Sequence, residues 1–314
     1  MLRTLRRRLL GLIFVLVGVS FLTFIVGYLA PGDPVQVLMG NRHDPALHRQ
    51  LLHFYGLDRP WWQQYGSYLW HALHGDLGTS FQYQGTSVTT IIGRGVPVSL
   101  ELGGLALVVT LLVGVPVGLI AALRRDSALD LASMAVMLVL YAIPTFILAP
   151  AILAVDVVSC NAGGRWPCLP VYGWGSPDHL VLPLLVYAAG GVAYVARLTR
   201  ASVLEVLGRD YIRTARAKGL GPLRLNLRHV LRNALIPIVT YIGPSVAFLV
   251  TGAFVIEYIF NIPGIGYQTI QSLGQRDYPV VEGTTLLLAT AVVVMNLLTD
   301  LAYTWLDPRI RADE

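Results

Sequence analysis

The chain has 314 residues, a formal net charge of +5 and a mean hydropathy of +0.62. Hydrophobic residues make up 55% of the sequence and charged residues only 13%, which excludes an ordinary soluble globular protein. The apolar residues form continuous runs rather than an alternating pattern, so we expect an all-α membrane protein and not membrane-spanning strands.

Uncharged runs near the bilayer-spanning length of about 20 residues predict six transmembrane helices. Four arginines precede the first run, as in a secretion signal, but its apolar core is too long and no small-x-small cleavage site follows it. We therefore interpret it as a retained anchor. Glycines and prolines inside the runs predict kinks and close helix contacts. The six runs are 11–30, 102–123, 131–155, 180–196, 234–256 and 283–299.

The distribution of basic residues predicts the orientation, because positively charged flanks stay on the cytoplasmic side. Nine basic residues lie between Arg197 and Arg232, and others lie at both ends of the chain and in the turn at Arg124. The loops 156–179 and 257–282 hold one each. Both termini are therefore predicted to be cytoplasmic.

The long outward segment (31–97) carries signals for two short helices. One is predicted to begin at Asp44 and Pro45 and to end at Gly56, and the second to run from Pro60 to Gly75. The second helix holds five aromatic residues, which predict an anchor at the membrane interface. An aromatic platform for substrate is the alternative interpretation.

The two cysteines, Cys160 and Cys168, both fall in an outward loop. In an oxidising compartment such a pair predicts a disulfide, which would stabilise the fold by about 2.5 kcal/mol on the chain-entropy estimate. Two free thiols are the alternative. Metal binding is not expected, because the nearby His179 does not complete a set of ligands.

Catalytic motifs are absent from the sequence. The chain has one lysine, Lys218, and the glycine that follows it rules out a phosphate-binding P-loop. No G-x-S-x-G or H-E-x-x-H pattern occurs. The ionisable residues noted near the spans, Glu101, Glu257 and Asp300, lie at helix ends, where we expect them to reach water or lipid headgroups. The sequence predicts no enzyme, no cofactor in this chain and no nucleic-acid partner.

The basic loop (210–237) reads "DYIRTARAKGLGPLRLNLRHVLRNALIP". Its first part predicts a short helix with Asp210 as cap, and a Gly-x-Pro break at Gly219 separates it from a second basic part. The small residues Ala215 and Ala217 would let another backbone approach closely. The arginines suit either an acidic partner or anionic lipid.

This loop resembles the EAA loop of ABC importer permeases, and more narrowly the dipeptide and oligopeptide branch. "LAPGDPV", "HGDLGTSF", "FNIPGIG" and "RDYPVVEG" occur in an order and spacing similar to that branch. Arg213 stands where the general motif has glutamate, and Thr214 where it has its first alanine, so Arg213 is not assigned that glutamate's role. The residues that the resemblance implies for docking an ATPase subunit are Thr214, Ala215, Lys218, Gly219 and Leu220.

The resemblance implies a type I ABC importer permease in the inner membrane. Its partners would be a second permease, two ATPase subunits that bind ATP and Mg, an extracytoplasmic solute-binding protein, lipid and a peptide substrate. Relatives that transport nickel chelates, glutathione or sugars leave the identity of the substrate open. The alternative classes of protein are an ion-coupled secondary transporter and a membrane assembly factor. The implied segments are a tail and first span (1–30), an extracytoplasmic segment (31–97), a five-helix core (98–306) with a cytoplasmic coupling loop (198–236), and a cytoplasmic tail (307–314).

Overall fold

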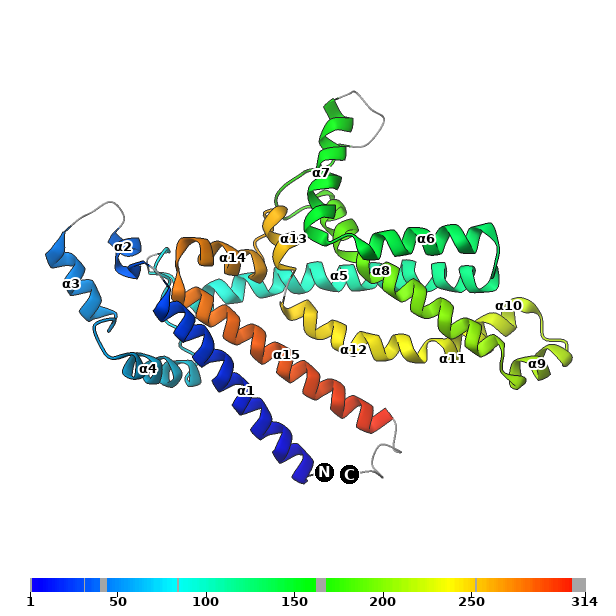
Figure 1. Ribbon diagram of the computed structural model, residues 1–314, viewed down its shortest axis with the longest axis horizontal. Helices are drawn as coiled ribbons and strands as arrows, with labels where there is room; N and C mark the ends of the chain where they lie inside the picture. Colours follow the sequence, from blue (N-terminus) through cyan, green and yellow to red (C-terminus); the bar gives the residue numbers. More distant parts are fainter. Residues whose placement is uncertain are drawn as a thin grey trace. The chain divides into compact units, whose positions relative to one another are not determined.

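The computed structural model describes residues 2–30, 32–39, 44–83, 85–161, 168–251 and 253–306, which are helical apart from connecting turns and one isolated bridge, Thr79 to Ser87 (Figure 1). The predicted tail at 307–314 lies outside these ranges. The chain divides into two compact units. Unit 1 comprises Met1–Ser99, Val250–Phe254 and Pro263–Glu314, and unit 2 comprises Leu100–Leu249 and Val255–Ile262.

Unit 1 pairs the first and last long helices and adds the segment 31–97. Its buried residues Val88, Ile91, Ile265 and Val280 form one apolar cluster. The helices α1 and α15 lie side by side (Figure 1). The helices are α1 (Leu2–Leu29), α2 (Pro34–Met39), α3 (Pro45–Phe54), α4 (Trp61–Leu73), the start of α5 (Val88–Leu123), α14 (Ile265–Gln275) and α15 (Tyr278–Leu306).

The two short helices predicted in the segment 31–97 are confirmed as α3 and α4. The Asp44 carboxylate accepts hydrogen bonds from the backbone N–H groups of Ala46 and Leu47, so it caps α3 as expected. Gly56 and Gly75 follow the two helices with positive φ values of 67° and 80°, which only glycine adopts without strain.

Unit 2 contains the rest of α5 and most of the remaining helices. Its buried residues Met137, Val192, Ala193 and Ala196 form a cluster between α6 and α8. These helices are α6 (Ala128–Ala142), α7 (Thr145–Asn161), α8 (Asp178–Leu207), α9 (Asp210–Ala217), α10 (Pro222–Leu225), the π-helical turn η1 (Asn226–Leu231), α11 (Arg232–Ala234), α12 (Ile236–Thr251) and α13 (Phe254–Ile259).

Two of the six predicted spans are not single helices. The run 131–155 bends by 108° between α6 and α7, because Ile143 precedes Pro144 and adopts extended dihedrals, with φ −81° and ψ 118°. The run 234–256 is divided among α11, α12 and α13, of which α12 has 16 residues. In the described residues four helices (α1, α5, α8 and α15) are long and apolar enough to cross a membrane, and the bent pair would make a fifth span.

Glycines bring α5 and α8 into close contact within unit 2. A Cβ atom at Gly118 would lie 2.3 Å from the Ala196 carbonyl oxygen, and one at Gly191 would lie 2.7 Å from the Thr110 hydroxyl oxygen. At Gly118 the obstacle is backbone, so a side chain there would move one helix away from the other, whereas at Gly191 the Thr110 side chain would have to shift. The close helix contacts predicted for glycines inside the runs are thus confirmed at Gly118.

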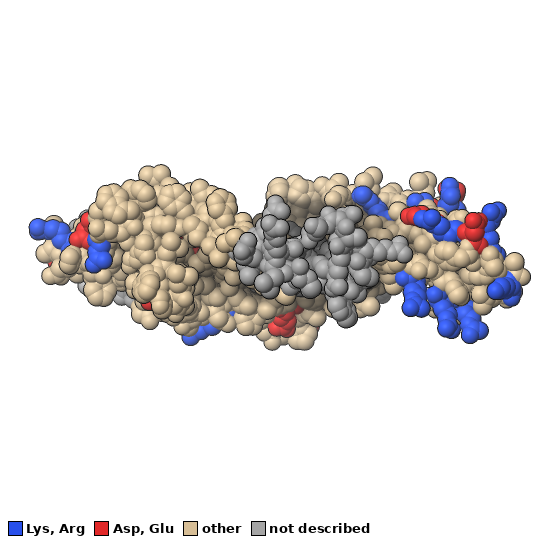
Figure 2. Space-filling view, turned by 90° about the horizontal axis from the view of Figure 1, so that it is seen from below, with Lys and Arg blue, Asp and Glu red and all other residues tan. Residues whose placement is uncertain are grey.

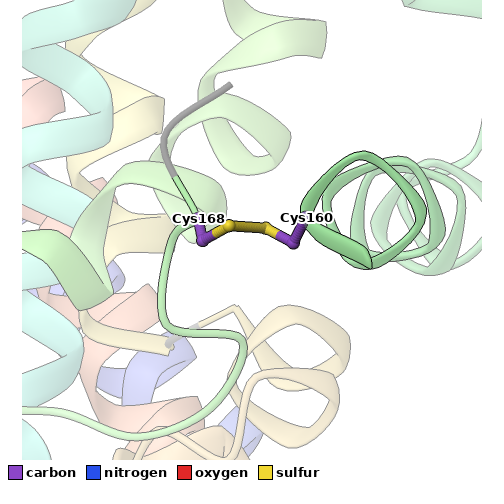
Figure 3. Close-up of a disulfide and its surroundings, with 2 residues drawn as sticks. All are labelled: Cys160 and Cys168. Carbon is purple, nitrogen blue, oxygen red and sulfur yellow. A yellow bond between two sulfur atoms is a disulfide. The ribbon is translucent and has the colours of Figure 1, made fainter. Parts of the chain in front are cut away.

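The end of α7 is joined to the segment that leads into α8. Cys160 and Cys168 form a disulfide across a Cα to Cα distance of 5.5 Å (Figure 3). The bridge joins the two cysteines for which the sequence predicted it, although Cys160 lies in the last turn of α7.

Candidate functional site

The basic loop leaves α8 after Leu207 and forms α9 at once. Asp210 is the first residue of α9, whereas the cap position is held by Arg209, whose side chain caps no backbone N–H group. The prediction that Asp210 caps the helix is therefore wrong. Its carboxylate lies in the first turn, where it faces the positive end of the helix dipole, and it lies 3.7 Å from the Arg213 guanidinium.

A Schellman motif ends α9. The N–H of Leu220 donates to the carbonyl of Ala215 at 3.3 Å, and the N–H of Gly219 donates to the carbonyl of Arg216 at 2.9 Å. Gly219 adopts a φ of +77°, which explains the glycine in structural terms. The chain then continues into α10, η1 and α11, so the predicted break between two helical parts is confirmed.

One face of α9 is anchored in unit 2. Ile212 is fully buried and Ala215 nearly so, and both join a cluster with Ala122 of α5 and Val203 of α8. Leu220, which follows the Schellman glycine, packs against the same cluster. Burial of a side chain such as Ile212 contributes about 2 kcal/mol. The helix α9 is therefore fastened to the ends of two long helices at once.

The five predicted docking residues do not share one face. Ala215 and Leu220 belong to the anchored side, where a partner could not reach Ala215 without disrupting the cluster. Thr214, Lys218 and Gly219 are exposed, and the Thr214 hydroxyl donates to the carbonyl of Asp210 at 3.1 Å. The structure thus separates residues that fasten α9 from residues that a partner can contact.

Exposed apolar side chains on the basic loop escaped the sequence analysis. Tyr211 is 44% exposed, Leu223 73% and Leu227 52%. The four-residue spacing of the two leucines among arginines was the available signal. Such a patch beside basic residues is typical of an interface with another protein. Figure 2 shows Lys and Arg side chains gathered at the end that carries α9 and α10; the basic residues of the loop are Arg213, Arg216, Lys218, Arg224, Arg228 and Arg232.

A buried ion pair next to the basic loop was also missed. The Arg200 guanidinium on α8 donates two hydrogen bonds of 2.7 Å, one to each carboxylate oxygen of Asp130 on α6. Asp130 is 3% exposed and also accepts from the backbone N–H of Asp126. Such a bidentate pair fixes both position and orientation. It ties α6 to α8, so α5, α6 and α8 are linked at this end of unit 2.

Glu257 contradicts one expectation. The residue lies in α13 and is fully buried, so it does not reach water within this chain. Burial follows from its place between the apolar residues Ile256 and Phe260, which are also buried. Among the described residues, no group of three or more His, Cys, Asp or Glu side chains is arranged to hold a metal ion.

These features define a class: a helical, multi-pass membrane protein whose basic loop is fastened to its long helices. Residues 114–312 match the family model of the binding-protein-dependent transport system inner membrane component, and residues 1–103 match the model of the N-terminal region of that component. The chain belongs to this family. It is therefore a multi-pass protein of the inner membrane and a membrane component of a transport system.

Two relatives are similar along almost their whole length. The dipeptide transport system permease protein DppB of Bacillus subtilis (strain 168) is 43% identical over 293 residues, which cover 93% of this chain and 92% of the relative. The protein of that name from Escherichia coli (strain K12) is 40% identical, with 99% of each chain covered.

A solved structure shares the fold. The inward-facing methionine ABC transporter MetNI matches with a TM-score of 0.51 and 18% identity, over 68% of this chain and 94% of that chain. The likeness shows the type I ABC importer permease fold.

Proposed function

We propose that this chain is the permease subunit that forms the translocation pathway of an ATP-driven importer for dipeptides and short oligopeptides. The observation that carries the proposal is the 43% identity to a dipeptide permease over 93% of the chain. No P-loop occurs in the sequence, so ATP would be bound and hydrolysed by other subunits. The further partners are a second, similar permease, two ATPase subunits and a solute-binding protein on the outward side.

The basic loop is the proposed docking surface for an ATPase subunit. Its exposed residues Leu223 and Leu227 supply apolar area, and the arginines around them supply charge for acidic groups on the partner. Thr214, Lys218 and Gly219 lie on the accessible side of α9 and would contact the same partner. Ala215 and Leu220 would act by fastening α9 rather than by touching the partner.

Docking of this kind would transmit movement to the pathway. The buried contacts of Ile212 and Ala215 join α9 to α5 and α8, and Gly118 holds those two helices together. A displacement of α9 would therefore move both helices as a body, because packed elements shift between discrete arrangements instead of deforming continuously. ATP-driven closure of the ATPase dimer would favour one arrangement through its contacts with the loop.

The transport test uses labelled alanyl-alanine in cells that depend on this importer for peptide uptake. We expect uptake that requires this chain, the solute-binding protein and ATP, and that excess unlabelled dipeptide blocks. Glutathione and a nickel chelate, added as competitors at the same concentration, should leave uptake unchanged. Uptake that persists in ATP-depleted membranes under an ion gradient would contradict the proposal.

The docking test uses Leu223→Asp, with Leu73→Asp as matched control. Leu73 is an exposed leucine (82%) at the end of α4, in the outward segment. Leu223→Asp should lower the amount of co-purified ATPase about tenfold, because truncated anchor residues commonly cost more than 1 kcal/mol of binding. Leu73→Asp should leave the ATPase bound. Equal recovery from both variants would remove Leu223 from the interface.

A further inference from the structure

Two adjoining cavities lie beside α1 and α15 in unit 1. The larger, of about 780 Å³, is lined by the last turns of α1, the end of α3, one side of α4, the loop at 76–81 and the start of α15. The smaller, of about 280 Å³, is a groove alongside α1 and α15. Gly27, Ala30, Tyr278 and Glu282 line both, so the two cavities meet at these residues.

The groove is apolar. Leu22 and Val26 of α1, Leu273 of α14 and Val281 of α15 form its walls, and the two α1 residues are largely exposed. The hydroxyl of Thr23 donates to the carbonyl of Val19 at 2.9 Å, so its hydrogen bond is satisfied within the helix. Because α1 and α15 have the length and composition of membrane spans, an apolar groove alongside them suits an acyl chain.

The larger cavity contains a carboxylate at the junction. The Oε1 atom of Glu282 lies 3.5 Å from the position that a Cβ would take at Gly27, and the Tyr278 ring lies 3.4 Å from that position. Within the described part of the chain, no side chain or backbone N–H donates a hydrogen bond to this carboxylate. Phe24 and Tyr28 add aromatic surface to the cavity wall. A carboxylate beside aromatic rings favours an ammonium group.

The other charged groups of the cavity wall are consistent with a zwitterionic headgroup. Arg59 supplies a guanidinium that can meet a phosphate, and Asp76 and His71 lie on the wall as well. Trp61, Trp62 and Trp70 are exposed on α4. Exposed tryptophans collect at the membrane interface, so α4 places the cavity at the depth of the lipid headgroups.

We propose that the two cavities together hold one outer-leaflet phospholipid with a primary ammonium headgroup, of the phosphatidylethanolamine type. Its ammonium group meets the Glu282 carboxylate in the larger cavity, and one acyl chain lies in the groove along α1 and α15. The amino group of a free peptide has the same ammonium chemistry, but a short peptide leaves the apolar groove empty. The site does not depend on which solute the transporter carries.

The test is lipid retention by the full chain, purified in detergent and stripped of lipid. Phosphatidylethanolamine or phosphatidylglycerol with identical acyl chains is added back, and bound lipid is counted by native mass spectrometry. We expect one phosphatidylethanolamine to be retained in preference to phosphatidylglycerol. Glu282→Gln should lower its retention about tenfold, because a hydrogen bond between charged groups is lost. Gly27→Leu should abolish retention by filling the junction.

Two matched control variants distinguish loss of the lipid site from general effects of a substitution on the protein. Asp178→Asn removes an exposed carboxylate from the first turn of α8, and Gly11→Leu adds the same side chain to α1 at a position with open space around it. Both should retain lipid as the unchanged protein does. Equal retention of the two lipids, or no effect of Glu282→Gln, would overturn the proposal. Binding of alanyl-alanine that depends on Glu282, without retention of phosphatidylethanolamine, would assign the site to peptides and also overturn it.

Discussion

The segment 31–97 and the basic loop contain the same local motif with different consequences. At Gly75 the N–H of Asp76 donates to the carbonyl of His71, which repeats the Schellman motif found at Gly219. The residue after the glycine differs. Leu220 folds back onto the apolar cluster of unit 2, whereas Asp76 begins a polar turn in which its carboxylate accepts from the N–H of Gly78.

The two regions are consequently held in place by different kinds of interaction. The loop after Gly75 is held by a buried carboxylate, Asp277, which accepts hydrogen bonds from the Ser80 hydroxyl and the Phe81 N–H. The basic loop is held by apolar packing through Ile212 and Ala215. A helix fastened by packing can move together with the helices beneath it, whereas directional hydrogen bonds hold a loop in one place.

The largest effect on stability is expected from Asp277→Ala. The substitution leaves the Ser80 hydroxyl and the Phe81 N–H buried without an acceptor, at a cost of about 3 kcal/mol. Hydrogen exchange should rise in the residues around Ser80 and stay unchanged in α9. A rise in both regions would show that they are not fastened independently.

The second largest effect on stability should come from loss of the disulfide. Cys160→Ser combined with Cys168→Ser should lower the free energy of unfolding by about 2.5 kcal/mol, because a small loop is no longer closed. The single variants should match the double one. Mass analysis of the unchanged protein should show two alkylated cysteines only after reduction; two that react without reductant would contradict the bridge.

A smaller effect on stability is expected from the residues that follow the two glycines, and it should differ between them. Leu220→Ala should cost about 2 kcal/mol, since an apolar side chain leaves its cluster, and Asp76→Ala under about 1 kcal/mol. Urea unfolding in mild detergent measures both. A larger cost for Asp76→Ala would reverse the comparison.

The smallest effect on stability is expected from replacing the two glycines, and it should be equal in the two regions. Gly219→Ala and Gly75→Ala both force a side chain into a positive φ with open space around it, so each should cost about 1 kcal/mol. Thermal unfolding of the two variants tests this equality. A much larger cost at Gly219 would mean that its surroundings, and not its backbone conformation, require glycine.

Features set by neighbouring residues could be predicted from the sequence. The caps at Asp44 and Gly56, the helix that ends at Gly75 and the division of the basic loop all follow from local chain geometry. Contacts between distant residues could not be predicted. Asp130 and Arg200 are 70 residues apart, and Ser80 and Asp277 are 197 apart, so no local pattern joins them. The buried face of α9 was missed for the same reason, since its burial depends on contacts with Ala122 and Val203.

The central claim is that the basic loop docks an ATPase, and affinity purification from the native membrane tests it most directly. The unchanged chain, Gly219→Trp and Gly75→Trp are purified in parallel, and co-purifying proteins are identified by mass spectrometry. Both substitutions place the same bulk at equivalent positions, so they strain the backbone alike. We predict that the unchanged chain and Gly75→Trp recover a P-loop ATPase and a second permease, and that Gly219→Trp loses only the ATPase. Recovery of the ATPase with Gly219→Trp, or a chain that purifies alone in several detergents, would contradict the account.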